Sequence, residues 1–113
     1  MAATTEDMAS AVAGLVEAGF HSSLERDDKT RDEVRIYERL RWTLTREAVH
    51  IELEALEYPD GTAAFYLALI DYHGLSTSSF PLDSWKLWPE RIEFKFYTHP
   101  ESGQGLTFTI KLV

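Results

Sequence analysis

The stretch VHIELEALEYPDGTAAFYLALI, residues 49–70, decides the fold of this chain. Its first half alternates apolar and polar side chains with the period of a strand that has one buried face: Val49, Ile51, Leu53 and Ala55 against His50, Glu52 and Glu54. The segment 58–62 is typical of a tight turn, because Pro59 presets one backbone dihedral and Gly61 permits a positive one. Residues 62–72 are apolar on both faces, which indicates a central strand or one whose second face is covered. Together these segments predict an antiparallel hairpin.

The same periodicity extends to both sides of this hairpin. Residues 34–44 place five apolar side chains on one parity, with a single glutamate among them. A helix over residues 36–44 is the competing interpretation, because Glu, Arg and Leu favour helices, but it would put Trp42 on the wrong side. Residues 92–97 and 106–112 alternate in the same way and predict two more strands.

The remaining segments have weaker signals. Residues 20–24 could start a short strand, whereas residues 27–32 are polar and are predicted to form a turn. Residues 73–90 contain glycine, a Ser/Thr cluster and two prolines, and are predicted to be irregular. The segment has no Gly-x-Ser-x-Gly sequence, so nothing marks one of its hydroxyls as a nucleophile.

One amphipathic helix is predicted over residues 5–19, because apolar side chains recur there at three- and four-residue spacing: Met8, Ala11, Val12, Leu15 and Val16. Thr4 followed by Asp7 resembles a capping box, and Gly19 is placed where a left-handed residue would end the helix. The predicted fold class is therefore α+β. One N-terminal helix packs on a single antiparallel sheet of five or six hairpin-connected strands, in one domain over residues 1–113.

Composition narrows the classes of function. The 113 residues include 19 acidic and 11 basic side chains, for a net charge of −8, which disfavours direct nucleic-acid binding. No cysteine is present, so disulfides, thiolate catalysis and cysteine-ligated zinc are excluded. Neither a signal peptide nor a run of about 18 apolar residues is visible, so we expect a cytoplasmic protein without membrane contact.

The charges are unevenly distributed along the sequence. Residues 47–85 contain seven acidic side chains and no lysine or arginine. Solubility alone is one explanation, and a contact surface for a basic partner is the other, since a negative field accelerates association with a cationic protein. The residues expected to bind such a partner are Glu52, Glu54, Glu57, Asp60 and Asp83 for the field, and Trp85 and Trp88 as aromatic anchors.

These observations predict a non-enzymatic protein-binding module. Proteins that handle nucleic acid commonly have basic grooves, and a small acidic protein that occupies such a groove blocks it. We therefore expect an inhibitor or immunity-type antagonist, such as a toxin-immunity or phage anti-CRISPR protein, whose basic partner is a nuclease or CRISPR effector. This is an analogy between classes of protein and not a resemblance of sequence. No catalytic, metal or cofactor residues are predicted, and an exposed edge strand would allow a homodimer by sheet extension.

Three alternatives stay open. Arginines 35, 39 and 41 could pair across strands with Glu52 or Glu54, which would neutralise part of the acidic face. A small-molecule pocket between helix and sheet would be lined by Phe65, Tyr66 and Trp42. A small enzyme would use His50 with Glu52, which share one strand face, although a straight row of side chains converges poorly on a metal or substrate.

Overall fold

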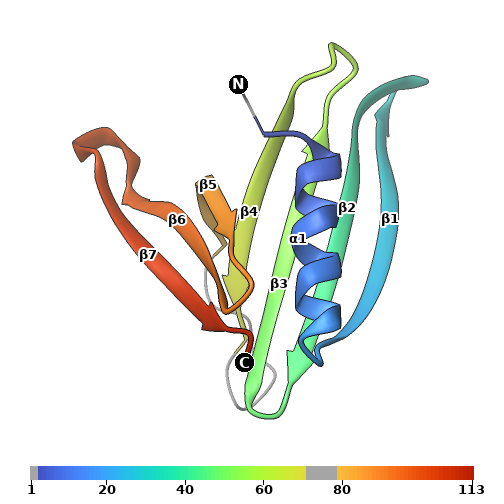
Figure 1. The fold of residues 1–113 in the computed structure, drawn as a ribbon. Coiled ribbons are helices and arrows are strands. Elements are labelled where there is room, and N and C mark those ends of the chain that lie inside the picture. The colour runs from blue at the N-terminus through green and yellow to red at the C-terminus, as the bar shows by residue number, and fades with distance from the viewer. Residues whose placement is uncertain (1–2, 71–78) are drawn as a thin grey trace.

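The computed structural model describes residues 3–70 and 79–113, apart from the side chains of residues 98–100. One α-helix, seven strands and a short 3-10 helix follow one another (Figure 1): α1 (Thr5–Glu17), β1 (His21–Arg31), β2 (Val34–Arg46), β3 (Val49–Glu57), β4 (Ala63–Leu69), β5 (Phe80–Leu87), β6 (Arg91–His99), η1 (Pro100–Ser102) and β7 (Gln104–Lys111). The strands form one sheet in chain order, and all neighbours are antiparallel. The predicted α+β class, with a helix on an antiparallel sheet, is confirmed, but the described residues form seven strands rather than five or six.

Helix α1 begins as its sequence predicts. The Asp7 backbone N–H donates to the Thr4 hydroxyl at 3.2 Å, and the Thr4 N–H donates to the Asp7 carboxylate at 2.8 Å, which together form the capping box. The helix ends at Glu17, two residues before the predicted end, and Gly19 follows with φ +100°. One face of α1 is buried: Met8, Ala11, Val12 and Leu15. No helix within the described ranges is long and apolar enough to cross a membrane.

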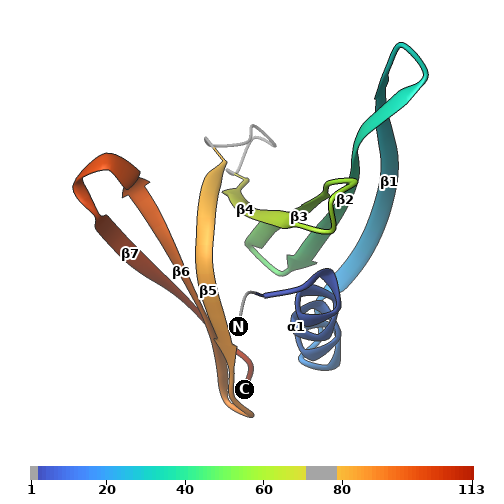
Figure 2. The same cartoon turned by 90° about the horizontal axis from the view of Figure 1, so that it is seen from above.

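The sheet curves around the helix, so that α1 lies inside an arc of strands (Figure 2). The inner face of the arc forms the core with α1, and Leu44, Leu53 and Phe94 are fully buried there. On this face Arg46 links two segments that are distant in sequence, the end of α1 and the end of β7. Its guanidinium donates to the carbonyl oxygens of Ala18 at 3.1 Å and Lys111 at 2.7 Å, and thereby holds the end of β7 against the end of α1.

Two strands were not predicted at their full extent. Residues 27–32 were expected to be a turn, but β1 continues to Arg31 and the turn is formed by Asp32 and Glu33, with φ of +51° and +66°. Positive φ at both positions gives the turn a twist that matches the flanking strands. Residues 80–87, expected to be irregular, form β5, which contains Pro81 and a bulge at Asp83.

The sheet divides between β4 and β5. Within the described residues two pairs join these strands, Tyr66 with Pro81 and Leu67 with Phe80, and no further pair continues toward Ala63 and Leu87. In this fork the ring of Phe65 meets the ring of Trp85 edge to face, with centroids 5.0 Å apart. The fork and the edge of α1 beside it leave open space on the inner side of β5, where the candidate site lies.

Candidate partner-binding groove

The structure separates the predicted partner-binding residues onto two faces of the sheet. Glu52 and Glu54 lie on the outer face of β3, away from α1, whereas Glu57 has the same parity as the buried Leu53 and Ala55 and faces the helix side. Asp83, Trp85 and Trp88 also lie near α1, because they line hollows between α1 and the β5–β6 hairpin. The seven residues therefore do not form a single surface.

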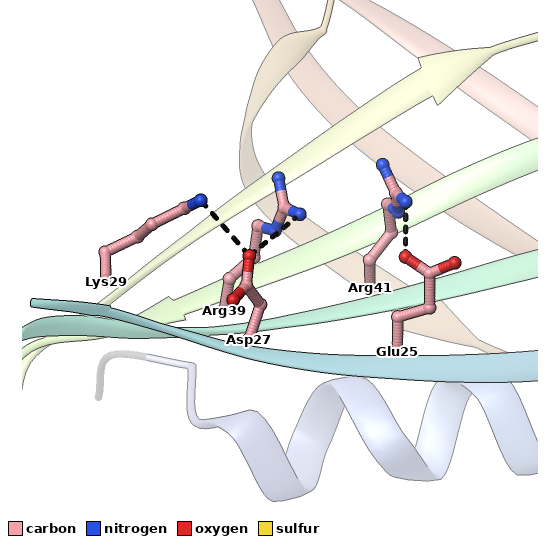
Figure 3. Close-up of polar contacts among 5 residues, drawn as sticks. All are labelled: Glu25, Asp27, Lys29, Arg39 and Arg41. Atoms are coloured by element: carbon pink, nitrogen blue, oxygen red, sulfur yellow. Dashed lines mark hydrogen bonds and ion pairs between the residues drawn. The ribbon is translucent and has the colours of Figure 1, made fainter.

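The outer charged face consists of seven side chains on three neighbouring strands: Glu25, Asp27, Lys29, Arg39, Arg41, Glu52 and Glu54. Figure 3 shows five of them standing on the side of the sheet away from α1. Arg41 forms an ion pair with Glu25. Asp27 is contacted by the Arg39 guanidinium at 3.4 Å and by the Lys29 ammonium at 3.2 Å. With four carboxylates and three cations, this face is close to neutral.

Arg41 is the central cation of this outer charged face. Its β-sheet neighbours are Glu25 on one side and Glu54 on the other. The hydrogen bond with Glu25, followed by the negative charges of Glu25, Glu52 and Glu54, raises the pKa of the Arg41 guanidinium above its ordinary value. Glu52 and Glu54 have no ion pair within 4.0 Å in the described parts of the chain. Arg39 and Arg41 therefore pair across strands with β1 and not with β3. Glu52 and Glu54 interact with Arg41 only through the longer-range attraction between their charges.

The helix groove runs along α1 and consists of three adjoining hollows, of which the first two face β5. The first, of 590 Å³, is lined by Asp7, Ser10, Asp83 and Trp85 among others. The second, of 500 Å³, continues toward the C-terminal end of α1 past Leu87, which lines both hollows. The third, of 670 Å³, lies at the N-terminal end of α1 beside the β3–β4 turn and shares Ala3 and Thr4 with the first.

The lining of the helix groove is acidic, and two arginines, Arg46 and Arg91, border its second hollow through their contacts with Ala18 and Trp88. Its lining includes five carboxylates, Glu6, Asp7, Glu17, Glu57 and Asp83, and no lysine or arginine within the ranges that the structure describes. Asp7 is engaged in the helix cap, and the other four have no ion pair within 4.0 Å in those ranges. Opposite charges largely neutralise one another on the outer charged face, whereas the charged side chains in the described lining of the groove are all acidic.

Apolar side chains give the groove a second property. Trp85 is half-buried, and its ring packs edge to face with the ring of Phe65. Leu87 is 46% exposed between the first two hollows, and its methyl groups face Gly14, where a β-carbon would meet them at 3.0 Å. Trp88 is half-buried beneath the guanidinium of Arg91, which lies 3.9 Å from the ring centroid. Leu87 was not among the predicted site residues. The bulge at Asp83 shifts the parity of β5, so the sequence does not indicate that Leu87 lies on the inner face.

Asp60 is held in the β3–β4 turn rather than in the groove. Its carboxylate accepts a hydrogen bond from the Thr62 hydroxyl at 2.7 Å and another from the Thr62 N–H at 2.9 Å. These two bonds, the hydroxyl first, lower the pKa of Asp60 below its ordinary 3.8. A carboxylate that already has two local donors is less available to a partner.

The alternative sites have geometry of their own. Trp42 and Phe65 are buried on the inner face, but Tyr66 lies on the outer one, so these three side chains do not line a common pocket. His50 and Glu52 share the outer face of β3 as expected, and the buried His50 Nε2 has no hydrogen-bond partner among the described atoms. Within the described residues there is no group of three or more His, Cys, Asp or Glu side chains that could hold a metal.

Comparison with known proteins found no match: no family model, no curated protein and no solved structure resembles this chain significantly.

Proposed function

We propose that this protein is a non-enzymatic binding module that accepts a basic segment of a partner protein in the helix groove. The observation that carries the proposal is the composition of the groove lining, which combines five carboxylates with the partly exposed Leu87 and includes no basic side chain in the described ranges. Cationic side chains of a partner would meet the carboxylates, while an apolar side chain would cover Leu87 and Trp85.

Groove shape adds to the effect of the charges. Carboxylates that surround a concave, partly apolar surface concentrate the negative potential and raise the local concentration of cations. The outer charged face lacks this property, because Glu25 and Asp27 are neutralised by their own arginines. The groove is therefore the better candidate for electrostatic capture, and Glu52 and Glu54 on the outer face add a weaker, long-range attraction.

Antagonism is the biological role that we propose for this binding. Nucleases and CRISPR effectors use cationic surfaces to hold phosphates, and a protein that occupies such a surface prevents nucleic acid from reaching it. An immunity-type inhibitor needs no catalytic group of its own, and a high association rate is its main kinetic requirement. The net charge of −8 favours that rate for a cationic target.

Two charge-reversal variants with the same change in net charge test the proposal. The groove variant carries Glu57→Lys and Asp83→Lys, and the matched control carries Glu52→Lys and Glu54→Lys on the opposite face. Partners captured from a lysate of the source cell would be identified by mass spectrometry, and their affinity for each variant measured by calorimetry. We expect the groove variant to bind at least ~10-fold more weakly, a loss of ~1.4 kcal/mol, and the control to bind less than ~3-fold more weakly.

The dependence of the association rate on salt concentration is the second test. The association rate should fall as ionic strength rises from about 20 to 200 mM, because screening shortens the range of the attraction. Equal losses in the two variants would refute the groove as the binding site. An association rate that does not depend on salt would refute the electrostatic mechanism.

A further inference from the structure

The two outer strands of the sheet differ in how they are protected against pairing with another chain. Strand β1 carries six charged side chains, which is a usual protection for an edge strand: Glu25, Arg26, Asp27, Asp28, Lys29 and Arg31. Strand β7 carries only one, Lys111, at its last position. Residues 106–110 of β7 alternate apolar side chains with threonine, and Leu106 is 56% exposed. An exposed, uncharged edge strand is a site for pairing with another strand.

The free part of this edge can be located. Among the described residues β7 pairs with β6 alone, and no other strand lies beside it in either view of the fold (Figures 1 and 2). At its end the Lys111 carbonyl accepts a hydrogen bond from Arg46 at 2.7 Å, so this end of the strand is already occupied. Residues Gln104–Ile110 remain available for pairing, and none of them is charged.

We propose that a second copy of this chain pairs with β7 in an antiparallel, two-fold symmetric arrangement centred on Thr107. Residues that face each other across an antiparallel pair lie on the same face of the sheet, so only a centre on a residue, and not between two residues, matches inner face with inner face. A centre on Thr107 uses the whole of Gln104–Ile110. It places Leu106 of one copy opposite Phe108 of the other, and thus covers the exposed leucine.

The charge distribution permits this association despite the net charge. Residues 86–113 contain four cations and three acidic side chains, whereas the excess of negative charge comes from residues 1–85. The acidic side chains of the helix groove are not part of the β7 edge. Because each copy uses its β7 once and β1 is guarded by charges, the assembly closes as a dimer and does not extend into a filament.

Cysteine cross-linking tests the register, since the natural chain has no cysteine. In Thr107→Cys the two introduced side chains would face each other, with β-carbons ~4.5–5.5 Å apart, close to disulfide range. In the matched control Thr109→Cys the two cysteines would be four residues apart along the strands, about 13 Å. We expect Thr107→Cys to form a disulfide-linked dimer at least ~10-fold faster than Thr109→Cys on a non-reducing gel. Equal rates would overturn the register.

Size-exclusion chromatography with light scattering tests the dimer itself. The native chain should have twice its monomer mass at high concentration, and Leu106→Lys should raise the dimer dissociation constant at least ~10-fold, because it places a charge in the paired edge. Salt should leave this dimer unchanged or stabilise it, which is the opposite of its effect on groove binding. A monomeric mass at all concentrations, or an unaffected Leu106→Lys variant, would overturn the proposal.

Discussion

The outer charged face and the helix groove contain similar numbers of carboxylates but use them differently. On the outer face Glu25 and Asp27 have cationic partners from β1 and β2, whereas no basic side chain in the described ranges lines the groove. Charges that form ion pairs within the molecule contribute to the stability of the fold. Unpaired like charges gathered in a hollow do not stabilise the fold, because their mutual repulsion opposes the compact state.

The cause of this difference lies in strand parity. Leu40 and Trp42 must face the core, so Arg39 and Arg41 between them are directed to the outer face, where they meet the acidic side chains of β1. The groove instead forms where β5 departs from β4, and the residues that α1 contributes to it, including Asp7 and Glu17, have no basic strand opposite them.

The largest effect on stability is expected from removing the central cation of the outer face. The variant Arg41→Met leaves Glu25, Glu52 and Glu54 without their shared positive charge, and it should lower the free energy of unfolding by about 1–2 kcal/mol. Urea denaturation measures this change. The control is Arg35→Met, an arginine half exposed and 3.6 Å from Glu38, which should change stability by less than about 0.5 kcal/mol. Equal effects would show that the outer face does not depend on Arg41.

The predicted and observed strands show what sequence periodicity can detect. Strands with one buried face, such as β2, β3 and β6, were predicted from alternation, because burial forces apolar side chains onto one parity. Almost all residues of β1 are exposed, so this edge strand has no alternation to detect. In β5 the bulge at Asp83 shifts the parity, so that Leu82 and Trp85 both face inward although they are three residues apart.

The candidate site was predictable only in part for the same reasons. The absence of basic residues over 47–85 drew attention to Glu57 and Asp83, and both line the groove. The contributions of Glu6 and Asp7 could not be inferred, since the contact of α1 with the fork depends on tertiary packing. Pairing of the arginines with β3 was one open alternative. Their pairing with β1, seen for Arg39 and Arg41, was not considered, because the full length of β1 was not recognised.

A smaller effect of opposite sign is expected in the groove. The double variant Glu57→Gln and Asp83→Asn removes two charges that repel their neighbours, and it should raise the free energy of unfolding by about 0.5 kcal/mol at low salt. The increase should shrink at 0.5 M salt, where exposed charges are screened. The matched control Glu25→Gln removes a paired carboxylate and should lower stability instead. A loss of stability in the groove variant would mean that these carboxylates have a structural role.

The smallest effect concerns Asp60, an acidic residue satisfied by hydrogen bonds instead of a cation. Because the folded protein lowers its pKa, the ionised carboxylate stabilises the turn above the ordinary Asp pKa of 3.8, and this contribution is lost as pH falls through the lower folded value. The variant Thr62→Val removes the hydroxyl donor, the larger cause, and should move the pKa of Asp60 back toward its ordinary value in a carboxyl NMR titration. Thr62→Ser keeps the hydroxyl and should retain the lowered pKa. If both variants titrate alike, the backbone N–H of residue 62, and not the hydroxyl, is the main cause of the lowered pKa of Asp60. The carboxylate oxygen that accepts from the hydroxyl would then be available to a basic partner.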